Sequence, residues 1–223
     1  MNANGFEKLH GIDEMDEKQV LTLCRTAEQL TRQKLSGTIE LYRPVKVQTG
    51  RTPRQTGARR IRRTNVMKRI GILGAGTWGM ALARMLTVSG NDVLVWSAIE
   101  KEIDSLSTTR KHPNLPQMKI PDELRFTKSI EEVCKDKDIL LFAVPSVFVR
   151  STAAKARPYV ADGQIIVDVA KGIEPDTLYT MTEILADELG REGGPKNVRL
   201  VALSGPTHAE EVAIDLPTTI VSA

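Results

Sequence analysis

The sequence has few of the residues that mark secreted, metal-binding and membrane-spanning proteins. Only two cysteines and three histidines occur among its 223 residues, and aromatic residues make up 4% of it. Cys24 and Cys134 lie far apart and outside any CxxC or Cys/His cluster, so we expect two reduced thiols and no metal site. Apolar runs do not reach membrane-spanning length and no secretory signal opens the chain, so we expect a cytoplasmic protein without a membrane span.

Acidic residues are missing from one long stretch near the N-terminus. Residues 1–66 carry 13 Lys and Arg against 7 Asp and Glu, whereas residues 67–223 carry 18 against 21. The segment 43–65 holds eight Lys or Arg and no acid, which predicts an extended or disordered chain. Two interpretations stay open: an arm that binds nucleic acid, and an unstructured leader, which we favour because no aromatics are interleaved.

The remainder of the N-terminal part has little core of its own. Residues 13–34 have the apolar spacing of an amphipathic helix, with Val20, Leu23 and Leu30 on one face. Met67 is a natural start for a globular domain. One hypothesis is that the start codon has been assigned too far upstream, so that translation begins at Met67. We therefore divide the chain into a poorly structured extension, 1–66, and a domain, 67–223.

From Met67 onward, strand-like and helix-like segments alternate, which predicts parallel strands joined by crossover helices. The expected strands are Arg69–Leu73, Asp92–Trp96, Leu124–Thr127, Ile139–Val144, Gln164–Val169, Val198–Leu203 and Thr218–Val221. The expected helices are Thr77–Val88, Ile99–Thr108, Ile130–Lys135, Val147–Ala156, Thr177–Leu189 and His208–Ala213. The fold class is therefore α/β, a doubly wound and mostly parallel sheet of the Rossmann type.

A GxGxxG motif stands between the first expected strand and the first expected helix. Gly74, Gly76 and Gly79 permit a tight turn, close approach of the backbone to a phosphate and close packing of helix on strand. The free N–H groups at the helix start would face the anion. We predict a dinucleotide-binding loop in which Thr77 and Trp78 are the variable pair, with Trp78 either flanking the cofactor or capping the core.

Further candidate residues follow the other strands. Ala98 stands where an acidic residue would indicate NAD and an arginine NADP, so the cofactor preference stays open. Lys171 follows a buried strand, where a charged group loses hydration unless an anion lies beside it. We therefore expect it to contact a polarised substrate or a phosphate. The alternative is a lysine whose side chain extends to solvent. Thr207 has N-cap spacing with Glu210 and would leave N–H groups free for an anion or a carbonyl.

Five segments, taken in order and spacing, resemble the bacterial type of NAD(P)-dependent glycerol-3-phosphate dehydrogenase. They are GAGTWGMALA at 74–83, VW at 95–96, AVPS at 143–146, KGIE at 171–174 and LSGPTHAEEVA at 203–213. The resemblance covers Met67 to the end of the chain, and KGIE followed by SGPT is its most specific part.

The resemblance implies reversible hydride transfer between NAD or NADP and dihydroxyacetone phosphate, giving sn-glycerol 3-phosphate for glycerophospholipid synthesis. It also implies site residues: cofactor contacts at Thr77, Trp78 and Ala209, substrate contacts at Gly205 and Thr207, and contacts to both at Lys171, our candidate catalytic side chain. A homodimer stays open for the complete protein.

Two departures from the family pattern limit what the resemblance implies. Ala98 replaces the Arg or His that members often carry, which leaves recognition of the adenosine ribose undetermined. The family continues into an all-helical domain with a proton-transferring lysine and a phosphate clamp, whereas this sequence ends at Ala223. We expect an incomplete form that binds dinucleotide weakly and turns over little. The rival hypothesis is a non-catalytic nucleotide-binding module with a basic arm that contacts nucleic acid.

Overall fold

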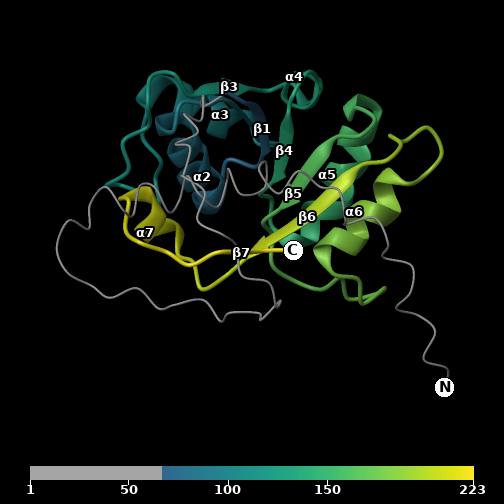
Figure 1. Cartoon of the computed structure of the whole chain (residues 1–223). Coiled ribbons are helices and arrows are strands. Elements are labelled where there is room, and N and C mark those ends of the chain that lie inside the picture. The colour runs from purple at the N-terminus through teal and green to yellow at the C-terminus, as the bar shows by residue number, and fades with distance from the viewer. Residues whose placement is uncertain (1–66) are drawn as a thin grey trace, which may run out of the picture.

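The computed structural model describes residues 67–223. The expectations for the helix at 13–34, the basic segment at 43–65 and Cys24 fall outside these residues. Within them the chain forms a sheet with helices on both faces (Figure 1).

Seven strands form one sheet in the order β3-β2-β1-β4-β5-β6-β7. Neighbouring strands are parallel from β3 to β6, and β7 pairs antiparallel with β6. The strands are β1 (Arg69–Leu73), β2 (Asp92–Trp96), β3 (Arg125–Thr127), β4 (Ile139–Phe142), β5 (Ile165–Asp168), β6 (Arg199–Ser204) and β7 (Val221–Ser222). This arrangement confirms the doubly wound, mostly parallel fold.

Helices α2, α3 and α7 cover one face of the sheet, and α4, α5 and α6 cover the other (Figure 1). The α-helices are α2 (Thr77–Val88), α3 (Glu100–Thr109), α4 (Ile130–Cys134), α5 (Val149–Ala156), α6 (Met181–Leu189) and α7 (Ala209–Ala213). Two short 3-10 turns, η1 (Ser146–Phe148) and η2 (Arg157–Tyr159), flank α5.

The central strands are apolar along their length because helices bury both of their faces. Ile70 and Ile72 of β1 pack in the cluster under α2, α3 and α7, whereas Leu73 packs in the cluster under α4, α5 and α6. All three side chains are at most 1% exposed. The sheet thus separates two hydrophobic cores and holds the carboxyl ends of its parallel strands along one edge.

The ends of most elements after β2 differ from the expected ends by one or two residues, and three elements differ more in their start, length or division. Helix α6 begins at Met181 and not at Thr177, because Thr180 and Glu183 form a capping box that starts the helix there. Residues 171–180 are therefore a loop. Strand β7 is only two residues long, and the segment from 147 to 156 is divided into η1 and α5.

Several chemical properties of the described residues bear on function. No helix within residues 67–223 has the length and apolarity to cross a bilayer. No group of three or more His, Cys, Asp and Glu side chains in this part of the chain could hold a metal ion. Cys134 is a free, buried thiol, and burial raises its pKa to about 12. It is therefore protonated and unreactive at neutral pH.

Candidate functional site

The glycine loop, residues 74–79, is held closely against the strands on either side of β1. The amide of Gly74 donates to the carbonyl oxygen of Trp96 at the end of β2 over 2.8 Å. A Cβ at Gly74, which has φ +123°, would lie 2.5 Å from the carbonyl oxygen of Ala143. A Cβ at Gly79 would lie 2.2 Å from the carbonyl oxygen of Gly74. These two glycines are required by the protein's own packing.

Gly76 has different surroundings from the other two glycines. It is exposed, has an ordinary extended conformation, and a Cβ there would meet nothing within 4 Å. Gly76 is the N-cap of α2, which has no side-chain cap and no acidic residue in its first turn. The first N–H groups of a helix lack intrahelical partners and carry partial positive charge. Open space beside such groups fits the approach of a phosphate.

Thr77 and Trp78 occupy the first turn of α2 and are both half-buried. Trp78 packs against the core cluster on the α2 side of the sheet. One of the two alternatives for this residue, a contact with the core, is therefore observed. Part of Trp78 remains exposed, and a cofactor contact stays a prediction.

The end of β2 carries an acidic group that the sequence analysis missed. The hydroxyl of Ser97 donates to Glu102 over 2.5 Å and accepts the amide of Ile99 over 3.1 Å. This contact brings the Glu102 carboxylate from the first turn of α3 back to the end of the strand, whereas Ala98 is exposed. Glu102 stands five positions after Ser97, inside α3, whereas the usual sequence signal is an acid directly after the strand.

The other predicted site residues lie in a row along the carboxyl edge of the sheet. The end of β4 at Ala143 already contacts the glycine loop. Ser146 stands three positions after Ala143, at the start of η1. A Cβ at Gly172 would lie 2.8 Å from the Cβ of Ser146, so the loop after β5 packs against η1. The Nζ of Lys171 then donates to the carbonyl oxygen of Gly205 after β6 over 2.9 Å. The ends of β1, β4, β5 and β6 are thus successive neighbours.

Lys171 is exposed, and its hydrogen-bond acceptor among residues 67–223 is the neutral carbonyl of Gly205. Within residues 67–223 no acidic side chain forms a salt bridge with Lys171, and its exposure agrees with the alternative of a lysine that reaches solvent. The expected contact with a substrate or a phosphate stays a prediction. Asp168, three residues earlier, is 4% exposed and accepts the amide of Ala170 over 3.1 Å. Its burial raises the carboxyl pKa to about 6.

After β6 the chain crosses the carboxyl edge and packs α7 against α2 (Figure 1). Arg84 of α2 donates to both carboxylate oxygens of Asp215, just beyond α7, over 2.7 and 3.0 Å. The two side chains are only 14% and 18% exposed. Ala209, at the start of α7, is buried in the same core cluster. This ion pair holds the crossing segment on the helix that begins at the glycine loop.

The prediction that Thr207 caps α7 was wrong. The N-cap is His208, which makes no side-chain cap bond, and the helix begins at Ala209. The amide of Thr207 donates to the carbonyl of Gly205 over 2.9 Å, in a tight turn. Because this N–H is already used within the turn, it is not a free donor for an anion. Thr207 still lies next to the carbonyl that accepts Lys171.

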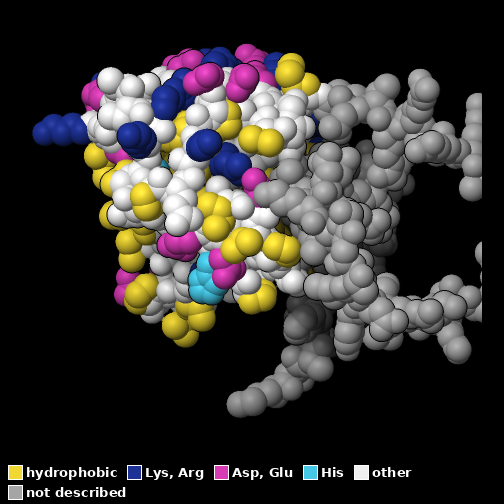
Figure 2. Space-filling view, turned by 90° about the vertical axis from the view of Figure 1, so that its left-hand side faces the viewer, with side chains coloured by type: hydrophobic (Ala, Val, Ile, Leu, Met, Phe, Trp, Pro, Cys, Tyr) yellow, Lys and Arg dark blue, Asp and Glu magenta, His cyan; other side chains and the backbone are white. Residues whose placement is uncertain are grey.

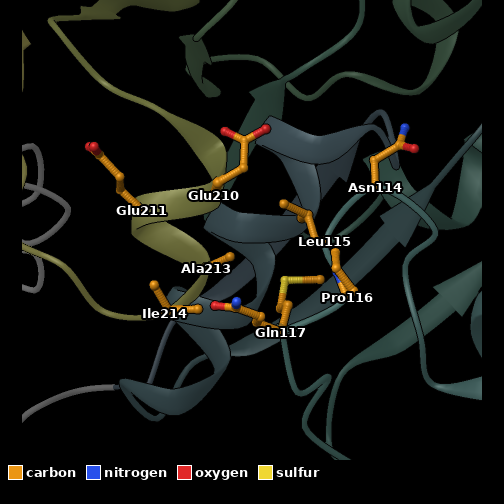
Figure 3. Close-up of a pocket in the computed structure, with 9 residues that line it drawn as sticks. Asn114, Leu115, Pro116, Gln117, Glu210, Glu211, Ala213 and Ile214 are labelled. Atoms are coloured by element: carbon orange, nitrogen blue, oxygen red, sulfur yellow. The ribbon is translucent and has the colours of Figure 1, made fainter.

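A pocket of about 250 Å³ opens between residues 114–118 and α7. Leu115 and Ala213 contribute to its apolar lining, while the side chain of Glu211 points away from the 114–118 segment (Figure 3). On the face of the molecule that includes α7, hydrophobic and charged side chains are interspersed (Figure 2). None of the predicted site residues lines this pocket.

Comparison with known proteins identifies the family. Residues 69–223 match the family described as NAD-dependent glycerol-3-phosphate dehydrogenase N-terminus. The chain belongs to this family.

Curated relatives support the assignment. Over 157 residues the chain is 69% identical to glycerol-3-phosphate dehydrogenase [NAD(P)+] 2 of Lactobacillus delbrueckii subsp. bulgaricus, covering 70% of this chain and 47% of that protein. It is 48% identical over 157 residues to the enzyme of Agathobacter rectalis, covering 70% and 45%. The chain therefore spans a little under half the length of these relatives.

A solved structure agrees with the fold. The crystal structure of glycerol-3-phosphate dehydrogenase from Coxiella burnetii matches with a TM-score of 0.60 and 30% identity, covering 69% of this chain and 46% of that one. The match to the family begins at Arg69, the first residue of β1. Sheet, glycine loop and Lys171 therefore all belong to the region shared with the family.

Proposed function

We propose that residues 67–223 are the dinucleotide-binding part of a glycerol-3-phosphate dehydrogenase. The activity is the interconversion of dihydroxyacetone phosphate and sn-glycerol 3-phosphate with NAD(P)H, in the cytoplasm, for glycerophospholipid synthesis. The observation that carries this proposal is the row formed by the glycine loop, Lys171 and Gly205 at the carboxyl edge of the sheet, in a chain of this family. Ligands of doubly wound sheets bind at that edge, where the strand order reverses.

The residues of the glycine loop fit a dinucleotide pyrophosphate. The open space at Gly76 admits a phosphate to the first N–H groups of α2, and the missing acid in that turn leaves their positive potential uncompensated. Thr77 and Trp78 would line the same position. A dinucleotide whose pyrophosphate lay at this position would supply or accept the hydride through its nicotinamide ring.

Lys171 supplies a positive charge at the edge where the substrate would lie. Its hydrogen bond to Gly205 sets the ammonium group beside the turn that carries Thr207. A cation held in place can attract a phosphate or polarise a carbonyl oxygen, which favours charge developing on that oxygen. Lys171, Gly205 and Thr207 are thus the proposed substrate contacts, and Ala209 a proposed cofactor contact.

A binding titration and an assay test this function. We expect the chain to quench or enhance NADH fluorescence saturably, and Lys171→Ala to weaken this binding, while Lys155→Ala, an exposed lysine on α5, leaves it unchanged. With dihydroxyacetone phosphate we expect turnover far below that of a full-length relative. Failure of the chain to bind either NADH or NADPH would overturn the proposal.

A further inference from the structure

Residues 171–180, the Lys171 loop, present an unusual distribution of exposure. Nine of these ten residues are exposed, and Glu174 alone is partly shielded. Ile173 and Leu178 are 63% and 74% exposed. The loop thus has little apolar burial to fix its position, although it carries the lysine that the proposed function places against cofactor and substrate. Another interaction must hold it.

The side chain of Glu174 supplies that interaction. Its two carboxylate oxygens accept the Nε and Nη2 donors of Arg150 on α5, each over 2.7 Å. The hydroxyl of Thr177 donates to the same carboxylate over 2.6 Å. Hydrogen bonds from Arg150 are the largest cause that lowers the pKa of Glu174, to about 2, so the carboxylate is ionised throughout the neutral range. A two-pronged arginine–carboxylate contact fixes orientation as well as distance.

Arg150 is itself fixed from the other side. Its Nη1 donates to Asp187 of α6 and lies 3.6 Å from Glu188, whose side chain is 3% exposed. Arg157 donates to the same Glu188 carboxylate over 2.8 Å. The guanidinium therefore belongs to an ion-pair network between two packed helices, so Glu174 is attached to a fixed part of the domain.

The main chain of Glu174 also closes the loop on itself. Its amide donates to the carbonyl of Tyr179, and its carbonyl accepts the amide of Leu178, each over 2.9 Å. One residue therefore joins both arms of the loop to each other and to α5. Lys171 stands three positions before it, and its Nζ reaches Gly205 over 2.9 Å.

We propose that Glu174, through its two hydrogen bonds to Arg150, is the positioning residue that holds Lys171 at the carboxyl edge of the sheet. The inference rests on the proposed function for the role of Lys171. Glu174 itself touches neither reacting group: it directs its carboxylate towards α5. Within the KGIE segment, Glu174 thus has a positioning role that differs from the role of Lys171.

A double-mutant cycle on NADH affinity tests this role. Glu174→Gln keeps the shape of the side chain but removes its charge and presents an amide N–H₂ group to Arg150. We expect it to weaken NADH binding about fivefold in the unsubstituted chain, and by less than about 1.5-fold when Lys171 is already alanine. Equal weakening in the two backgrounds, or none in either, would overturn the inference.

Matched variants separate positioning from general destabilisation. Asp187→Asn removes the charge of another acceptor of Arg150 but belongs to α6, outside the loop, so it should lower stability with NADH affinity unchanged. Arg150→Lys keeps the charge and loses the two-pronged contact, so it should weaken binding as Glu174→Gln does. An effect of Asp187→Asn on binding as large as that of Glu174→Gln would contradict a positioning role.

A second measurement does not depend on cofactor binding. Lysine acylation at trace reagent concentration, read by mass spectrometry, compares the reactivity of Lys171 with that of the exposed Lys155. We expect Glu174→Gln to change this ratio at least about twofold and Asp187→Asn to leave it unchanged. An unchanged ratio in Glu174→Gln would overturn the inference. Absence of NADH binding by the unsubstituted chain would instead overturn the proposed function, and the acylation ratio would still decide whether Glu174 positions Lys171.

Discussion

The glycine loop and the Lys171 loop lie at the same edge of the sheet but are held by different physical means. Residues 74–79 are confined by backbone atoms that leave no room for a Cβ at Gly74 or Gly79. The loop of residues 171–180 is largely exposed. The ion pair between Glu174 and Arg150 attaches it to α5, alongside the contact of Gly172 with η1 and the hydrogen bond from Lys171 to Gly205. Local steric fit thus holds the turn at 74–79, whereas the exposed loop that carries Lys171 is held by contacts with residues distant in the sequence.

The largest expected effect comes from adding one methyl group to the confined loop. Gly79→Ala would place a Cβ 2.2 Å from the carbonyl oxygen of Gly74, so either α2 or β1 must shift. We expect a loss of at least about 3 kcal/mol in the free energy of unfolding, measured by urea denaturation. Gly76→Ala is the control, since its Cβ meets nothing, and should change stability by less than about 0.5 kcal/mol. Equal losses in the two variants would remove the distinction between these glycines.

Stability near the Lys171 loop should depend on the charge of Asp168. Burial raises its pKa to about 6, so the folded state favours the protonated carboxyl and that contribution is lost as pH rises through 6. Asp168→Asn should therefore stabilise the domain by about 2 kcal/mol at pH 7.5 and by much less near pH 4. Urea denaturation at both pH values measures the difference.

The control for Asp168 is an exposed acid in the loop itself. Asp176→Asn should leave the free energy of unfolding unchanged at both pH values, because its side chain is exposed. A gain at pH 7.5 that persists undiminished at pH 4 would show that the charge of Asp168 is not its cause.

A smaller effect concerns binding and not folding. Gly76→Ala should weaken NADH affinity about tenfold, because the added methyl group occupies the space through which a phosphate reaches the first turn of α2. A fluorescence titration measures it, with thermal unfolding run on the same samples. An unchanged affinity in a stably folded variant would place the pyrophosphate elsewhere.

The smallest expected effect is on the choice between NADH and NADPH. The Glu102 carboxylate at the end of β2 would repel the 2′-phosphate of NADPH. Glu102→Gln should raise the affinity for NADPH relative to NADH about threefold. Glu100→Gln, at a neighbouring exposed carboxylate near Lys128, should leave the ratio unchanged. If both variants shift the ratio equally, the effect belongs to the general charge of α3.

Much of the fold could be predicted because its signals are local. The strand at Arg69–Leu73, the helix at Thr77–Val88 and the strand at Asp92–Trp96 have the bounds expected from apolar pattern and glycine spacing. The start of α6 was missed because the capping box of Thr180 and Glu183 begins the helix at Met181, while Thr177 donates to Glu174 in the preceding loop. The prediction that Thr207 caps α7 was also wrong, because the amide of Thr207 donates to the carbonyl oxygen of Gly205 within a turn.

The sheet, the glycine loop and the resemblance to the dehydrogenase family could be predicted from the sequence, because periodicity, glycine spacing and short motifs are properties of neighbouring residues. The contacts of Glu174 with Arg150 and of Lys171 with Gly205 could not be predicted in this way, because these pairs are separated by 24 and 34 positions along the chain. Such pairs form only after the helices and strands have packed, since packing sets which ends of distant elements meet. The position of Lys171 is therefore a property of the fold, whereas its presence after a buried strand is a property of the sequence.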